Sequence, residues 1–179
     1  IQEKLQGLVH MDSADNTSGW TREHIEAAIR GIAEVHSIWL GREEELKQQP
    51  WLVDYPTTQN MKEKLRLWEL LGVHCREEFP EWFSEQDLSN YRDIVHSIGD
   101  WWSLIEMMPR TLIHNDFNPR NIAFRREADG SLRLCAYDWE LATLHLPQHD
   151  LVELIGFTLY DPLDPAEVEY YIELHRTEI

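Results

Sequence analysis

The sequence HNDFNPRN spans residues 114–121, and the sequence YDWE spans residues 137–140. Two short runs of β-forming residues, 122–126 and 132–137, lie between them and are separated by a turn that contains Asp129-Gly130. This dipeptide is a strong hairpin signal, because glycine tolerates the positive φ that a tight turn requires. The pattern predicts a polar loop that leads into an antiparallel hairpin, with an acidic residue directly after the second strand.

Such a hairpin would gather three polar side chains at its open end. Asp116 and Asn121 belong to the loop that enters the first strand, and Asp138 leaves the second strand. Pro119 stiffens the loop between them. Mg²⁺ in proteins is held by one or two carboxylates together with phosphates and water. The sequence therefore predicts a site for a hard divalent cation, with one carboxylate left to accept a proton from a hydroxyl group.

Apolar residues recur at helical spacing before this motif. Three helices are expected along the stripes 25–39, 61–79 and 88–105. Thr21 is the expected N-cap of the first helix and Gly41 its stop, and Ser84 is the expected N-cap of the third.

Two further helices are expected after the motif. A short one runs over residues 150–159, and a last one begins at Asp164-Pro165-Ala166-Glu167, which combines a cap, a proline at the first helical position and a capping-box acid. The expected apolar face of the last helix comprises Val168, Tyr171, Ile172 and His175. The fold class is thus expected to be mainly α with a small β-hairpin (α+β).

The pattern HxDxxxxN, followed by a hairpin and a second Asp, is similar to the kinase signature of a catalytic loop and a metal-binding Asp. With YDWE after the hairpin, the chain resembles the aminoglycoside phosphotransferase and choline kinase family rather than the protein kinases. Residues 1–5 resemble the interlobe hinge of that family, residues 33–36 the end of its first C-lobe helix, and residues 146–151 the segment after the metal-binding Asp. The resemblance implies a protein-kinase-like C-lobe over residues 8–179, a hinge over 1–7, and a catalytic loop and metal-binding hairpin within 110–140, with the N-lobe absent.

The resemblance also implies a function and roles for particular residues. The reaction would be ATP-dependent transfer of the γ-phosphate to a substrate hydroxyl, with Mg²⁺ as cofactor. Asp116 would orient and deprotonate the hydroxyl, and Asn121 and Asp138 would hold Mg²⁺ against the phosphates. His114 would pack under the catalytic loop, and Asp150 would brace that loop or cap the next helix.

For the nucleotide base, the resemblance implies that Glu3 and Leu5 offer backbone hydrogen bonds to adenine. Ala123 and Tyr137 would form the apolar floor beneath the base. No glycine-rich phosphate loop and no strand lysine with a helix glutamate occur in the 179 residues. Since those parts position the phosphates in a kinase, the isolated chain is expected to transfer phosphate only at background rates, while a longer parent protein is active.

Acidic residues outnumber basic ones by 33 to 16, which gives a formal net charge of -17. Nucleic acids and anionic membranes are therefore unfavourable partners, because binding to both needs clustered Lys and Arg. No apolar run approaches the ~20 residues that cross a bilayer, and no charged leader precedes an apolar stretch. Cys75 and Cys135 stand far apart, which fits reduced thiols. These features favour a cytoplasmic protein, and its acidity favours a cationic acceptor such as an aminoglycoside or amino alcohol, with sugars and sterol-like alcohols still open.

Two other functions fit parts of the pattern. One is a pseudokinase or binding module that keeps the fold without catalysis. The other is a metal-dependent hydrolase that uses His114, Asp116, Asp138, His145 and His149. Pro147 lies between the last two histidines and argues against a helical pair of zinc ligands.

Overall fold

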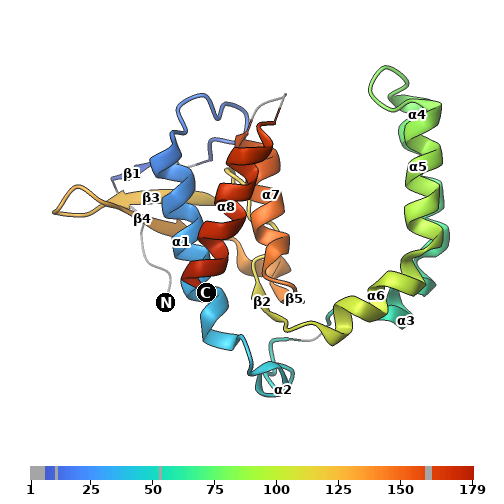
Figure 1. The fold of residues 1–179 in the computed structure, drawn as a ribbon, viewed down its shortest axis with the longest axis horizontal. Helices are drawn as coiled ribbons and strands as arrows, with labels where there is room; N and C mark the ends of the chain where they lie inside the picture. Colours follow the sequence, from blue (N-terminus) through green and yellow to red (C-terminus); the bar gives the residue numbers. More distant parts are fainter. Residues whose placement is uncertain (1–6, 11, 53, 160–162) are drawn as a thin grey trace. The chain divides into compact units, whose positions relative to one another are not determined.

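A computed structural model describes residues 7–10, 12–52, 54–159 and 163–179. The chain divides into two compact units: the first comprises Ile1–Val53 and Arg110–Ile179, and the second comprises Asp54–Pro109. Over the described ranges the chain forms eight α-helices and two small antiparallel sheets (Figure 1). The α+β prediction is therefore confirmed.

The larger sheet of the first unit contains the predicted hairpin. Its strand order is β1-β3-β4, with β1 at Leu8–Val9, β3 at Ile122–Arg126 and β4 at Leu132–Ala136. The hairpin ladder pairs the first residue of β3 with the last residue of β4, and Gly130 in the turn has a φ of 89°. β3 has the predicted bounds, because alternating apolar residues and a glycine turn are local signals. β4 ends at Ala136, one residue before the predicted end at Tyr137.

A second, two-stranded sheet pairs β2 (Thr111–Ile113) with β5 (Thr143–His145). These strands were not predicted, since three residues are too few for an alternating pattern to be recognised. A short 3-10 helix, η1 (Trp139–Leu141), precedes β5. The second sheet brings the chain before the polar loop against the chain after the hairpin.

Helix α1 (Arg22–Trp39) forms the centre of the first unit. It begins after the predicted N-cap Thr21, whose backbone N–H donates to His24 Nδ1 at 3.1 Å, and it ends just before Gly41. α1 packs against β4, α7 (Gln148–Thr158) and α8 (Pro165–Glu178) (Figure 1). The short α2 (Glu43–Leu46) follows it. The buried core of this unit comprises Trp20, Ile25, Ala28, Ile29, Ile32, Phe117, Ile122, Phe124, Leu151, Leu154, Ile155 and Tyr171.

Phe117 links this core to the polar loop. Its side chain is fully buried, although its neighbours in the sequence are polar. Burying a phenylalanine side chain stabilises a fold by ~2–3 kcal/mol. The loop that carries Asp116 is therefore anchored in the core one residue after that carboxylate.

The second unit consists of α3 (Thr58–Glu63), α4 (Leu65–Glu78), α5 (Glu85–His96) and α6 (Ile98–Met107). The predicted stripes are present, but each is divided between two helices, at Lys64 and at Ser97. The prediction of two uninterrupted helices is therefore wrong. Both interrupting residues have ψ near 0°, so the apolar spacing continues past them. Ser84 caps α5 as predicted, in a reciprocal capping box with Asp87.

The last two helices differ in detail from their predictions. α7 begins at Gln148, two residues earlier than expected, with Pro147 as its N-cap. In α8, the N-cap Asp164 accepts a hydrogen bond from Ala166 N at 2.9 Å, while Glu167 accepts one from the Tyr171 hydroxyl. Ile172 is 48% exposed, so its predicted place on the apolar face is wrong. None of the helices among the described residues is long and apolar enough to cross a membrane.

Candidate active site

Asp116 lies half-buried in the loop between β2 and β3, where two asparagine side chains hold its carboxylate. Asn121 Nδ2 donates to Asp116 Oδ2 at 2.6 Å and to the Asp116 carbonyl oxygen at 3.0 Å. Asn118 Nδ2 donates to Asp116 Oδ1 at 2.7 Å. Each carboxylate oxygen thus receives one amide hydrogen. The plane of the carboxylate is fixed, and both oxygens keep lone pairs for another donor.

The surroundings determine how both amides are turned. Asn118 Oδ1 accepts a hydrogen bond from Arg120 N at 3.0 Å, so the amino group of Asn118 faces Asp116. The amino group of Asn121 also faces Asp116, and the Asn121 carboxamide oxygen therefore keeps its lone pairs for a ligand. Asn121 itself is only 5% exposed. A carboxamide oxygen beside a carboxylate is a donor set that suits Mg²⁺.

Asp138 directly follows the last residue pair of the hairpin ladder. Tyr137 N donates to Asn121 O at 3.0 Å, which extends the ladder by one pair and places the backbone of Asp138 one residue beyond the partner of Asn121. Asp138 is exposed. Its φ of 63° and ψ of 58° are left-handed, a conformation that costs energy outside glycine and that marks functional sites.

His114 connects the polar loop to the end of the hairpin. Its side chain is fully buried, and Nε2 donates to Tyr137 O at 2.9 Å, so the loop is tied to the residue directly before Asp138. Its ring lies against Trp139, with centroids 4.4 Å apart. Because Nε2 donates to a carbonyl, it carries the proton, and the buried Nδ1 has no hydrogen-bond partner among the described residues.

Asp150, on the first turn of α7, holds the other end of the loop. Its fully buried carboxylate accepts His114 N at 2.8 Å, Asn115 N at 2.9 Å and His36 Nε2 at 3.0 Å. These three donors offset the free-energy cost of burying the carboxylate, which is high without hydrogen-bond partners. They also fix Asn115 in a left-handed conformation with a φ of 63°.

The Asp150 network continues to the C-terminal helix. His36 Nδ1 lies 3.0 Å from His175 Nε2, and both rings are buried. Since His36 Nε2 donates to Asp150, its Nδ1 is an acceptor and His175 Nε2 is the donor. Burial, together with the neighbouring His36, lowers the pKa of His175 to about 4. Three helices are thus joined to the loop by one chain of hydrogen bonds.

Sequence reasoning missed Glu153, which also contacts the loop. Glu153 Oε2 accepts Phe117 N at 2.8 Å, and Oε1 lies 3.4 Å from Asn118 Nδ2. Glu153 follows Asp150 by one helical turn on α7. No local signal in the sequence identifies it, because its main partner is a backbone N–H group 36 residues earlier.

Of the four residues expected at the nucleotide base, the structure describes Ala123 and Tyr137. In the hairpin register, Asn121, Ala123 and Tyr137 share one face, since alternate residues of paired strands point the same way. The Tyr137 hydroxyl donates to Arg120 O at 2.7 Å and accepts from Asp12 N at 3.2 Å, and burial raises its pKa. Glu3 and Leu5 lie outside the described residues, as does most of the expected hinge.

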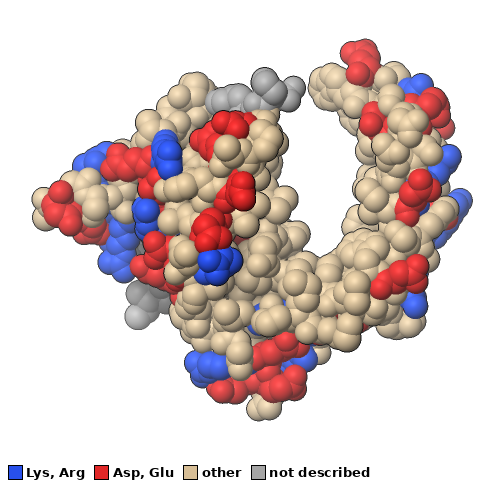
Figure 2. Space-filling model, viewed as in Figure 1, with Lys and Arg blue, Asp and Glu red and all other residues tan. Residues whose placement is uncertain are grey.

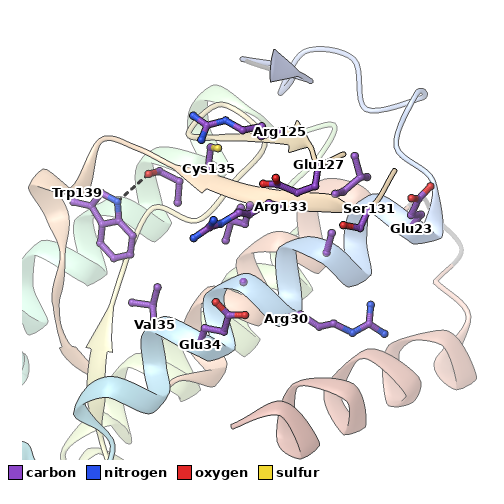
Figure 3. Close-up of a pocket in the computed structure, with 15 residues that line it drawn as sticks. Glu23, Arg30, Glu34, Val35, Arg125, Glu127, Ser131, Arg133, Cys135 and Trp139 are labelled. Atoms are coloured by element: carbon purple, nitrogen blue, oxygen red, sulfur yellow. Dashed lines mark hydrogen bonds between the residues drawn. The ribbon is translucent and has the colours of Figure 1, made fainter. Parts of the chain in front are cut away.

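A groove of about 1150 Å³ lies elsewhere, between α1 and β4 (Figure 3). Figure 3 shows Trp139 toward one end of it and Glu23 toward the other. Its charged lining is mixed in sign, with Arg30 and Glu34 from α1 facing Arg133 and Glu127 from the hairpin. Asp116, Asn121 and Asp138 do not line this groove, so it is separate from the loop.

The acidic excess is not gathered over the visible face of the first unit. Figure 2 shows Lys and Arg beside Asp and Glu there. Arg30 is within 3.2 Å of both Glu26 and Glu178, and Lys47 lies 2.7 Å from Glu43. The net charge by itself therefore does not locate a site for a cationic ligand.

The ligand set that the hydrolase alternative requires does not assemble. Within the described ranges, no three His, Cys, Asp or Glu side chains are close enough to hold a metal ion together. The rings of His145 and His149 lie 5.1 Å apart, the first in β5 and the second in α7. Burial and the neighbouring His149 lower the pKa of His145 to about 4.

Comparison with known proteins agrees with the motif. None of the curated proteins searched matches the chain. A family model described as "Phosphotransferase enzyme family" (APH) matches residues 2–177, which is nearly the whole sequence. The match contains the polar loop, the hairpin and the helices that support them. On this match, the chain belongs to the phosphotransferase enzyme family.

Proposed function

We propose that this protein is an ATP-dependent kinase of small molecules, which transfers the γ-phosphate to a substrate hydroxyl. The observation that carries the proposal is the carboxylate of Asp116, oriented on both oxygens by Asn118 and Asn121 at 2.7 and 2.6 Å. An oriented carboxylate with free lone pairs can accept the proton of an alcohol. Phosphoryl transfer depends on such positioning and on charge stabilisation.

Asn121 and Asp138 are proposed to hold Mg²⁺. Three observations support this. The Asn121 amino group, not its oxygen, faces Asp116, Asp138 is exposed, and Asp138 follows the ladder partner of Asn121 by one residue. Bound there, Mg²⁺ would neutralise charge on the phosphates. The amino group of Asn121 would keep Asp116 in place at the same time. One side chain would thus serve both the metal and the base.

In this proposal the first unit corresponds to the core of a kinase-like C-lobe. Ala123 and Tyr137 lie on the hairpin face that also carries Asn121, which supports a place for them beneath the adenine ring. Glu3 and Leu5 would offer backbone groups to its edge. The acceptor would be a small hydroxyl compound, with amino alcohols and aminoglycosides favoured by the acidic chain.

The test is ADP release by the full-length protein with Mg²⁺ and ATP, screened against a panel of sugars, amino alcohols and aminoglycosides. We expect turnover with one class of hydroxyl compound, loss of turnover in EDTA, and at least a hundredfold loss in Asp138→Asn. Asp129→Asn, an exposed acid in the hairpin turn, is the matched control and should behave as wild type. Tight nucleotide binding without turnover on any acceptor would instead favour a pseudokinase.

A further inference from the structure

Two carboxylates on α7 hold the loop on both sides of Asp116. Asp150 accepts the N–H groups of His114 and Asn115, and Glu153 accepts the N–H of Phe117 at 2.8 Å. Asp150 and Glu153 are three residues apart and therefore share a face of the helix. The backbone is thus fixed at the residue before Asp116 and at the residue after it.

Glu153 also reaches the side chain that orients Asp116. Asn118 Nδ2 lies 2.7 Å from Asp116 Oδ1 and 3.4 Å from Glu153 Oε1. An amino group has two hydrogens, so the Asn118 amide can bridge the two carboxylates. Its oxygen is held by Arg120 N, and the side chain is 8% exposed. The amide is therefore restrained on every polar atom.

We propose that Glu153 and Asn118 are positioning residues of the phosphotransfer step, an inference that rests on the proposed function. Glu153 holds the Asn118 amide, and the amide holds the Asp116 carboxylate toward the substrate hydroxyl. Without Glu153, one hydrogen of the amide loses this acceptor, and only Arg120 N and Asp116 still restrain the Asn118 side chain. Misplacement of a reacting group by about 1 Å can lower a rate on the order of 100-fold.

The first test is Glu153→Gln in the full-length protein. Glutamine keeps the size of the side chain but has one acceptor oxygen, and its amino group would face either Phe117 N–H or the Asn118 amino group. We expect kcat to fall about 10- to 100-fold, with both KM values within about threefold of wild type. Glu167→Gln is the matched control, because Glu167 is a half-buried glutamate that accepts a side-chain hydrogen bond on α8, away from the loop. It should keep the kcat of the wild type.

The second test is a double-mutant cycle with Asn118→Ala. If Glu153 acts through Asn118, Asn118→Ala alone lowers kcat as much as the double variant does, and the two losses do not add. Additive losses, or a fall in activity that follows only the folded fraction in thermal melts, would show a structural role and overturn the proposal.

A measurement without turnover separates the two proposals. In amide NMR spectra, Glu153→Gln should shift the Asn118 side-chain resonances and speed hydrogen exchange at Phe117, while Glu167→Gln leaves both unchanged. Unchanged Asn118 and Phe117 signals in Glu153→Gln would refute the positioning role whatever the activity. Wild-type turnover with a fully active Glu153→Gln would refute it as well and leave the proposed function standing, whereas absence of any wild-type turnover would remove the proposed function and this inference with it.

Discussion

The carboxylate of Asp150 accepts the backbone N–H of His114 at 2.8 Å, across 36 residues of sequence. It also accepts Asn115 N and His36 Nε2, and it is fully buried. The start of the polar loop is therefore held by an acid that has no direct contact with Asp116 among the hydrogen bonds of the described residues. The stability of the fold and the placement of the loop depend on the same side chain.

We predict that Asp150→Asn destabilises the protein by about 3 kcal/mol, because an amide offers one acceptor oxygen to three donors and places an amino group against N–H groups. Urea unfolding at pH 7 measures the change. Asp93→Asn is the control, an exposed acid on α5, and it should change stability by less than ~0.5 kcal/mol. Equal stability of the two variants would contradict the assigned role of Asp150.

The buried His175 makes stability depend on pH. Its pKa is lowered to about 4 in the folded state, so the unfolded chain binds a proton more readily between pH 6.5 and 4. Stability therefore rises with pH across this window, and the contribution of His175 is lost as pH falls through it. Asp150 and His36 are the ionisable groups that face the ring.

The measurement is the difference in unfolding free energy between wild type and His175→Gln. At pH 7 the variant should be less stable, because a glutamine side chain does not fill the space of the buried imidazole ring. The difference should shrink by as much as ~3 kcal/mol between pH 6.5 and pH 4, since only the wild type must bury a histidine that tends to protonate. A difference that is constant over this range would contradict the burial of a neutral His175.

Because α1 lies very close to β4, replacing a glycine of α1 with alanine should destabilise the protein. At Gly31 an added Cβ would lie 2.4 Å from Leu134 Cβ, so Gly31→Ala should destabilise the protein by about 1–3 kcal/mol despite the helix preference of alanine. Gly156 on α7 has no atom within 4 Å of such a Cβ, so Gly156→Ala should stabilise it by about 0.5–1 kcal/mol. Thermal or urea unfolding measures both. Stabilisation by both substitutions would show that α1 does not lie this close to the hairpin.

The features that sequence reasoning predicted well have local causes. The hairpin follows from Asp129-Gly130 between two β-forming runs. The first residues of α1 and α5 follow from the N-caps Thr21 and Ser84. Each signal acts within a few residues of the structure it determines.

The features that it missed depend on contacts between distant segments. His36 and His175 are 139 residues apart, and each alone reads as one more residue of an apolar helix face. The breaks at Lys64 and Ser97 leave the apolar spacing unchanged, so periodicity does not reveal them. Glu153 was not identified because its partner is a backbone N–H of the loop, which any residue could supply.

The central claim is that Asp116 acts on the acceptor hydroxyl, and single-turnover transfer by the full-length protein with Asp116→Asn tests it most directly. Asparagine keeps the shape of the side chain but is a poor base. We predict that the nucleotide Kd stays within about threefold of wild type while the transfer rate falls at least about 1,000-fold. A transfer rate within tenfold of wild type would contradict the account.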